Sequence, residues 1–203
     1  MESLDSFMER LASPSPAPGG GAASALVALT AASLITMVSK ITMEKKGYED
    51  RREEMARISS RSLAASESLR HLIEEDERAF NRVVQAWKMP KATEEEKARR
   101  AQALREASRY AISVPWKIAL VSSDIMDMAA QVARDGLKSA VTDAGSAAEF
   151  ALSAARAVLL NVRVNAQNLS DGEREDEEIK TRLFLEDMES RHRKVMETVG
   201  GRM

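Results

Sequence analysis

The residue with the clearest chemical potential in this sequence is Asp76, a carboxylate inside an apolar stripe. Ile73 and Phe80 recur at helical spacing, and Asp76 falls three residues after the first and four before the second. A carboxylate on such a face is expected to be partly buried, so it must be paired, hydrogen-bonded or raised in pKa. A raised pKa suits general acid or base catalysis, whereas a salt bridge or a cap to another helix is the structural alternative.

A second carboxylate, Asp143, lies in the segment Thr142-Asp143-Ala144-Gly145, at the expected start of a later helix. The default interpretation of Thr142 or Asp143 is an N-cap. The backbone N–H groups and the dipole of a helix start would also keep this carboxylate ionised, as a base or a stabiliser of positive charge. We therefore expect Asp76 to be the proton donor of the pair and Asp143 its ionised partner.

Two features offer positive charge to an anion. Gly19, Gly20 and Gly21 precede an Ala-rich helix and would present bare backbone N–H groups at its positive end. Their structural alternative is a tight turn that lets helices pack closely. The pair Lys45 and Lys46 follows that helix and is placed to receive a carboxylate, although such pairs usually lie in solvated turns.

Asparagines form a ladder on one face of the fifth expected helix. Asn161, Asn165 and Asn168 stand at positions i, i+4 and i+7 of a Leu- and Val-rich run. Buried amides need partners, so they either bind the edge of a polar heterocycle or tie helices together. Arg163 falls between them and points elsewhere, towards a possible anion.

Composition excludes several kinds of chemistry. The chain has no cysteine, so disulfides, thiolate zinc sites and thiol nucleophiles are absent, and a reducing cytoplasmic location is expected. Neither His71 nor His192 has the setting of a metal ligand, and we predict no metal. A net charge of -2 gives no global field towards nucleic acid or anionic membrane, so neither is an expected partner.

The elements that must position these residues are helices. Three prolines and three glycines between Ser13 and Gly21 end a short first helix, and a segment apolar on all sides follows to about residue 43. A long helix is predicted over about residues 50–88, and its apolar stripe is predicted to face the core along Leu69, Ile73, Phe80, Val84 and Trp87. Thr93 and Glu96 form a capping box for the next helix. That helix is predicted to stop at Gly136, and two more helices, over about residues 139–169 and from about residue 173, complete the set.

The predicted fold is therefore all-α, a single helical-bundle domain of about six helices over residues 1–203, one of them kinked or divided at Pro115. The uncharged stretch from Ala22 to Val38 is the only candidate for a membrane span. It is short and diluted by serines and threonines, so we interpret it as a buried helix. Its small side chains favour the middle of a bundle or a subunit interface.

Together these fragments resemble the cyclodeaminase domain family of formiminotransferase-cyclodeaminase, which includes stand-alone methenyltetrahydrofolate cyclohydrolases. The resemblance covers nearly the whole chain, and its strength lies in the order and spacing of the pieces. These are Pro16-Ala17-Pro18-Gly19-Gly20-Gly21, Thr42 with Lys45-Lys46 and Tyr48, Asp76 with Ala79-Phe80 and Val83, Met89-Pro90-Lys91, Val114-Pro115 with Ile118-Ala119, Thr142-Asp143-Ala144-Gly145, and Leu159-Leu160-Asn161-Val162-Arg163-Val164-Asn165. Ala22 departs from the family, which usually has serine there.

The resemblance implies an all-helical homodimer that binds a tetrahydrofolate carrying a one-carbon unit, without metal, nucleotide or tightly bound cofactor. It implies catalytic roles for Asp76 and Asp143. Substrate binding would fall to Gly19, Gly20, Gly21, Lys45, Lys46, Asn161, Arg163 and Asn165.

Three activities are compatible with the resemblance. The first choice is a formiminotetrahydrofolate cyclodeaminase, which releases ammonia to give 5,10-methenyltetrahydrofolate. The second is a methenyltetrahydrofolate cyclohydrolase, which opens that ring to 10-formyltetrahydrofolate. A folate-binding or scaffold protein without catalysis is the third, because Ala22 removes one hydroxyl from the glycine loop. No residue in the sequence separates ammonia from water as the reaction partner.

Overall fold

Six α-helices and two short 3-10 helices make up residues 3–203, the part of the chain that the computed structural model describes. No strand occurs in this described range, which confirms the all-α prediction. The helices are α1 (Leu4–Leu11), α2 (Gly20–Glu44), α3 (Arg52–Trp87), α4 (Glu94–Asp135), α5 (Val141–Ala166) and α6 (Asp171–Arg202), with η1 (Glu49–Arg51) before α3 and η2 (Lys138–Ala140) before α5.

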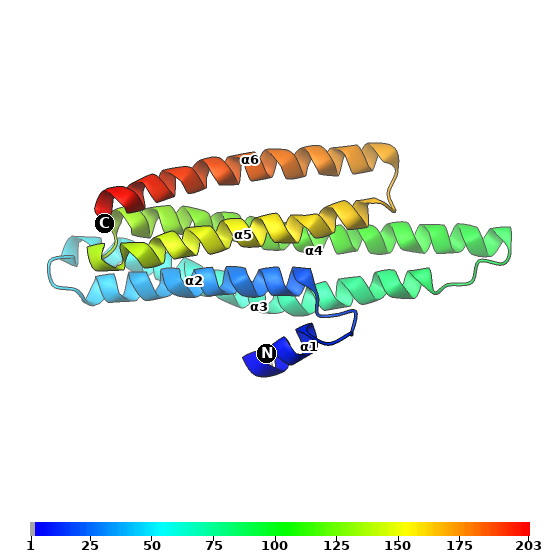
Figure 1. The fold of residues 1–203 in the computed structure, drawn as a ribbon, viewed down its shortest axis with the longest axis horizontal. Coiled ribbons are helices and arrows are strands. Elements are labelled where there is room, and N and C mark those ends of the chain that lie inside the picture. The colour runs from blue at the N-terminus through cyan, green and yellow to red at the C-terminus, as the bar shows by residue number, and fades with distance from the viewer. Residues whose placement is uncertain (1–2) are drawn as a thin grey trace.

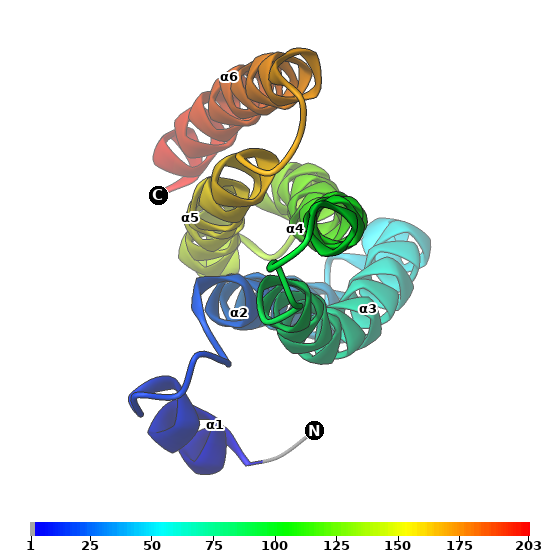
Figure 2. The same cartoon turned by 90° about the vertical axis from the view of Figure 1, so that its right-hand side faces the viewer.

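The four helices α2 to α5 form the central bundle, and their long axes lie close to one direction (Figure 1). Viewed end-on, α2 and α5 occupy one side of the bundle and α3 and α4 the other, while α6 packs over α5 and α4 (Figure 2). The short helix α1 lies outside the bundle, next to α2. The core is therefore built mainly from the facing sides of four antiparallel helices.

Local sequence signals explain where the helices begin and end. The Thr93 hydroxyl accepts from the Glu96 N–H at 3.2 Å, and the Glu96 carboxylate accepts from the Thr93 N–H at 3.1 Å, as the predicted capping box requires. Gly136 follows the last residue of α4 as expected. Pro115 lies inside α4 and does not divide it, because neighbouring helices support the chain on both sides.

Helix α2 is the most buried element, as its small apolar side chains predict. Ala25, Ala28 and Ile35 are fully buried. Burial is not complete all round, however, because Val27 and Met37 remain 37% and 38% exposed on the outer face. Among the described helices, α2 alone has the length and composition to cross a membrane, yet 56% of its most apolar window is buried in the bundle.

The hairpin of α3 and α4 extends beyond the ends of α2 and α5 (Figure 1). The apolar stripe of α3 accordingly faces the core only in part. Leu69 and Ile73 are buried as predicted, whereas Phe80 and Trp87 are 37% and 52% exposed. The prediction that the whole stripe faces the core is wrong for these two aromatic residues, because periodicity does not reveal how far neighbouring helices extend.

Candidate active site

Asp76 meets the first turn of α2 and is half-buried there. Burial raises the pKa of its carboxyl from 3.8 to about 6, the Ala22 N–H that donates to it acts in the opposite direction, and the charge of Glu77 raises the pKa further. Because α2 has no side-chain cap of its own at Gly19, the Asp76 carboxylate also serves as a partner for one of its free N–H groups, that of Ala22. Asp76 therefore caps another helix, as the structural alternative predicts, and also has the raised pKa that suits general acid or base catalysis.

Gly21 is what allows this approach. A Cβ built at Gly21 would lie 2.2 Å from Asp76 Oδ1 and 2.5 Å from its Cγ, far inside van der Waals contact. Any other residue at this position would displace the carboxylate or the helix. By contrast, a Cβ at Gly19 or Gly20 would meet no heavy atom within 4 Å. Gly21 therefore makes room for the Asp76 side chain, whereas Gly19 and Gly20 leave open space beside the backbone.

That open space is a cavity of about 270 Å³ at the N-terminal end of α2. Its lining includes six of the predicted site residues, which come from three helices and the loop before α2. The carboxylate of Asp76 lies on one side and the amides of α5 on the other. The lining consists of Pro16, Ala17, Gly19, Gly20, Gly21, Asp76, Ala79, Phe80, Ala111, Asn161, Val164 and Asn165.

The three asparagines of α5 lie in three different settings. Asn168 donates its Nδ2 to Ser108 Oγ at 3.0 Å and so ties α5 and α4 together, as the structural interpretation predicts. Asn165 donates its Nδ2 to the carbonyl oxygen of Ala111 at 3.0 Å while lining the cavity. Asn161 also lines the cavity, and no protein partner for its side chain is found within residues 3–203, so its amide is open to a ligand.

Lys45, Lys46 and Asp143 lie at the opposite end of the molecule. Helices α2 and α5 run antiparallel, so the C-terminal end of α2 meets the start of α5 (Figure 1). Asp143 and Asn161 are 18 residues apart on one helix, which separates them by about 27 Å. Within one chain the structure does not bring Asp143 or the lysine pair to the cavity.

Asp143 also lies differently from its default interpretation. It is in the first turn of α5, and the N-cap position belongs to Ala140, which makes no side-chain capping bond. Nearby, the Thr42 hydroxyl accepts from the Leu137 N–H at 2.9 Å and the Tyr48 hydroxyl accepts from the Lys138 N–H at 3.2 Å. Thr42 and Tyr48 thereby fasten this distal end together.

Two further residues do not line the cavity. Arg163 is exposed and lies in a hollow between α5 and α6 that is lined by Glu175, Glu178, Glu186 and Glu189. Its anionic neighbours are therefore protein carboxylates. Ser24 does not replace the family serine at Ala22, because its hydroxyl donates to the Gly20 carbonyl of its own helix at 2.6 Å.

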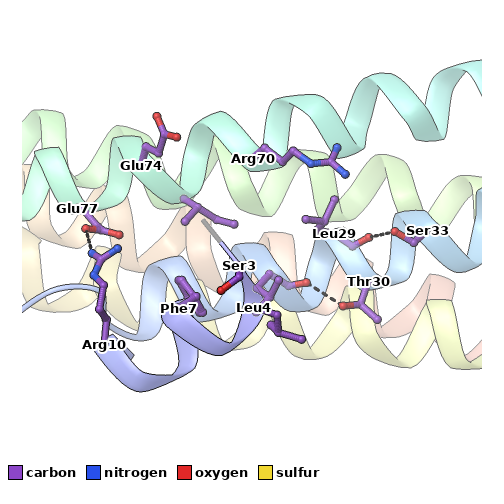
Figure 3. A pocket seen from close by; sticks show the side chains of 12 residues that line it. Ser3, Leu4, Phe7, Arg10, Leu29, Thr30, Ser33, Arg70, Glu74 and Glu77 are labelled. Atoms are coloured by element: carbon purple, nitrogen blue, oxygen red, sulfur yellow. Dashed lines mark hydrogen bonds and ion pairs between the residues drawn. The ribbon is translucent and has the colours of Figure 1, made fainter. Parts of the chain in front are cut away.

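A larger cavity, of about 520 Å³, lies between α1, α2 and α3 (Figure 3). Its wall is mostly apolar, with Phe7 and Leu29 prominent, and an ion pair between Arg10 and Glu77 spans one end. The hydroxyls of Thr30 and Ser33 donate to carbonyls of their own helix and are not directed at a ligand. None of the residues predicted to be catalytic or to bind substrate lines this cavity, so size alone does not mark the site.

Sequence reasoning missed Phe80, Ala111 and Val164 as part of the site. Phe80 was assigned to the core, yet it lines the cavity with more than a third of its side chain exposed. Ala111 could have been found from the sequence, because it stands four residues before Pro115, which has no N–H to donate to the Ala111 carbonyl. Within residues 3–203, no group of three or more His, Asp or Glu side chains is arranged to hold a metal ion.

The chain is similar to known proteins over most of its length. The sequence model of the formiminotransferase-cyclodeaminase family matches residues 3–183. The chain is 36% identical over 179 residues to the methenyltetrahydrofolate cyclohydrolase of Methylorubrum extorquens, covering 88% of this chain and 86% of that protein. It is 34% identical over 169 residues to the formimidoyltransferase-cyclodeaminase of Mus musculus, where it covers 83% of this chain and spans only 31% of the mouse protein.

A solved structure extends the likeness to three dimensions. The crystal structure of formiminotetrahydrofolate cyclodeaminase from Thermotoga maritima superimposes with a TM-score of 0.82 at 30% sequence identity. The match covers 98% of this chain and 96% of that one. The extent of the sequence match and the shared helical architecture lead to one conclusion: this chain belongs to the formiminotransferase-cyclodeaminase family, through its cyclodeaminase domain.

Proposed function

We propose that this chain is a folate one-carbon enzyme, a formiminotetrahydrofolate cyclodeaminase that releases ammonia to give 5,10-methenyltetrahydrofolate. The observation that carries the proposal is the half-buried Asp76, whose pKa is raised to about 6 where it faces a cavity at the start of α2. A carboxyl with that pKa keeps a protonated fraction near neutral pH and so suits proton transfer to a departing amine.

The reaction needs an acid and no covalent intermediate. N10 of the substrate attacks the formimino carbon and forms the new C–N bond, and the amine nitrogen leaves with the electron pair of the bond that breaks. That nitrogen must gain two protons to depart as ammonia. One originates on N10 and the other comes from Asp76, while Asp143 is the proposed ionised group that takes the N10 proton or stabilises the cationic carbon.

The second candidate is a methenyltetrahydrofolate cyclohydrolase. It is favoured by the 36% identity to a relative of that name, of which this chain covers 86%. Water would then attack the methenyl carbon and the ring would open to 10-formyltetrahydrofolate. Both reactions pass through a tetrahedral carbon between N5 and N10, so one cavity with Asp76 can serve either. A folate-binding protein without catalysis is the third candidate.

Parallel assays of the purified protein separate these candidates. Ammonia release from 5-formiminotetrahydrofolate, faster than the spontaneous rate, would establish the deaminase. Faster opening of 5,10-methenyltetrahydrofolate alone would establish the hydrolase, and folate binding without either turnover would establish the binding protein. Absence of both folate binding and turnover would contradict the proposal. We further propose a cytoplasmic protein that needs no tightly bound cofactor, no nucleic acid and no membrane.

We also propose that the working form is a homodimer, because a single chain leaves the predicted site divided. The outer face of α2 and α5, here called the α2–α5 face, carries exposed apolar side chains along its whole length. These are Val27 and Met37 on α2, and Phe150, Leu160 and Val164 on α5. The face is not covered by α1 or α6 (Figure 2).

The geometry of a two-fold dimer fits this face. A helix of 25 residues is about 35 Å long, and two helices side by side are about 20 Å wide, so the face is close to the ~800 Å² per partner of a standard interface. A two-fold axis perpendicular to α2 places the N-terminal end of one α2 beside the C-terminal end of its partner. Asp143 and the lysine pair of one protomer would then approach the other protomer's cavity.

Sedimentation checks the assembly directly. At micromolar concentration the molecular mass measured by sedimentation is expected to be about twice the chain mass of 22.3 kDa. Met37→Asp, in the middle of the α2–α5 face, is expected to shift it towards monomer, because a charge would be buried without a partner. An exposed control of the same type, Leu183→Asp on α6, is expected to leave it unchanged. A strictly monomeric wild type would contradict the dimer.

Gly20 tests whether a ligand approaches the bare backbone of α2. Gly20→Val is expected to weaken binding of 5-formyltetrahydrofolate by at least roughly tenfold while helicity is kept, because the new side chain enters cavity space and its Cβ has no protein atom within 4 Å. Gly172→Val is the matched control, since Gly172 also lies in a helix's first turn with no neighbour within 4 Å. An unchanged affinity of Gly20→Val for 5-formyltetrahydrofolate would show that the glycine loop serves only to let helices pack closely.

A further inference from the structure

Pro115 creates an unusual acceptor inside α4. Proline has no backbone N–H, so the carbonyl of Ala111, four residues earlier, loses its normal helical donor. Ala111 is buried, with 4% of its surface exposed, and a buried carbonyl needs a partner. Asn165 on α5 supplies it, with its Nδ2 donating to Ala111 O at 3.0 Å.

This bond fixes which way the Asn165 amide points. A carbonyl oxygen only accepts, so the amide nitrogen of Asn165 must face Ala111. Its Oδ1 is then the group left for the cavity, which Asn165 and Ala111 both line. Asn168, one turn later, gives the contrast, because it donates to Ser108 Oγ and does not line the cavity.

We propose that Pro115 is a positioning residue that acts through Asn165, so that this wall of the cavity presents a hydrogen-bond acceptor and selects a substrate edge bearing an N–H donor. The inference rests on the proposed function, under which that edge belongs to the reduced pterin ring of tetrahydrofolate. An Asn165 amide free to turn would offer its NH₂ group as readily as its oxygen. Pro115 removes that freedom, and it does so without contacting the substrate.

Pro115→Ala restores the N–H that reclaims the Ala111 carbonyl, and it replaces a poor helix former with the best one. The variant is expected to keep or raise its thermal stability. Its KM for the folate substrate, and its Kd for 5-formyltetrahydrofolate, are expected to rise roughly tenfold, the size of one hydrogen bond. Because Asp76 is untouched, kcat is expected to stay within about threefold of wild type.

A double-mutant cycle with Asn165→Ala tests the coupling. Asn165→Ala alone is expected to raise KM by a similar factor, and the double variant by no more than either single change. The double variant also avoids an unpaired Ala111 carbonyl, so a folding defect in Asn165→Ala does not obscure the result. Asn168→Ala is the control, expected to lower stability and leave KM unchanged.

Two results would overturn the inference alone, while a wild type that binds and turns over folate keeps the proposed function intact. One is an unchanged KM in Pro115→Ala. The other is a double variant whose KM rises by the product of the single effects, about a hundredfold, which would mean that the two residues act independently. A wild type that neither binds nor converts folate would instead remove the proposed function, and this inference with it.

Discussion

Replacing Asp76 with asparagine is expected to lower kcat by roughly a hundredfold or more, the usual size of a general acid–base contribution, with little loss of folate affinity. Asparagine keeps the shape of the side chain, and its Oδ1 can still accept from the Ala22 N–H. It has no carboxyl proton to transfer to the departing amine. The measurement is steady-state turnover of 5-formiminotetrahydrofolate together with the Kd of 5-formyltetrahydrofolate.

The pH dependence follows from the same carboxyl. Burial raises the pKa of Asp76 to about 6, so in the wild type kcat/KM is expected to fall above about pH 6, as the free enzyme loses its acid. A folate bound in the cavity is expected to bury the carboxyl further and so to raise its pKa, which moves the expected fall in kcat to higher pH. In Asp76→Asn the limb at about pH 6 should be absent.

Stability gives an independent readout. The folded-state pKa of Asp76 lies above its ordinary value of 3.8, so its ionisation costs stability progressively as pH rises from about 4 to about 6, by at most about 3 kcal/mol. At pH 8 that cost is fully present, and Asp76→Asn removes it. The melting temperature of the variant is therefore expected to equal or exceed that of the wild type at pH 8.

Glu74→Gln is the matched control for Asp76→Asn. Glu74 lies two residues earlier on α3, pairs with Arg78 at 3.7 Å and does not line the cavity at the start of α2. Unlike Glu77, it is not one of the charges that raise the pKa of Asp76. Its replacement is expected to keep kcat within about threefold of wild type. Near-normal turnover in Asp76→Asn, combined with a lower melting temperature, would show that Asp76 only joins α3 to α2.

Mixing two defective variants is expected to restore activity if each site uses both protomers. Asp143→Asn alone is expected to lower turnover and also to weaken folate binding, because a fixed charge stabilises the bound ground state. In a random mixture with Asp76→Asn, half the dimers are heterodimers, and each holds one site with both aspartates and one with neither. About a quarter of wild-type activity is then expected from two preparations that are nearly inactive separately.

Co-expression with two affinity tags provides the measurement, since tandem purification isolates heterodimers with about half of wild-type activity. An Asp76→Asn homodimer that carries both tags is the control, because it passes through the same purification and contains no site with both aspartates. Heterodimers of the two aspartate variants with no recovered activity would contradict a shared site. They would leave Asp143 without a role at the cavity, about 27 Å from Asn161 along α5.

The helices themselves were predictable because their ends are encoded locally. The prolines and glycines before Gly21, the pair Thr93 and Glu96, and Gly136 each act over one helical turn, and each marks a boundary in the structure. Asp76 was also predictable, since one carboxylate in an apolar stripe must find a polar partner. Its partner, the first turn of α2, was not, because periodicity gives the face of a helix and not its neighbour.

The separation of Asp143 and the lysine pair from the cavity was not predictable for the same reason, because the sequence does not show which helices are neighbours. The sequence placed Gly20, Asp143 and Asn165 near helix ends, but which ends meet depends on the antiparallel packing of α2 and α5. Helix length alone sets Gly20 and Lys45 about 35 Å apart, so a single chain has no means of uniting them. The role of Pro115 was hidden for another reason, since its missing N–H matters only where Asn165 lies across from Ala111.

A crystal structure of the protein with 5-formyltetrahydrofolate tests most directly the central claim, that the cavity between Asp76 and the start of α2 is the folate site. The expected result is a pterin ring in the cavity lined by Gly20, Asn161 and Asn165, with the N5–N10 region within hydrogen-bonding reach of an Asp76 carboxyl oxygen. Folate bound instead between α1 and α3, or with its one-carbon unit away from Asp76, would contradict it.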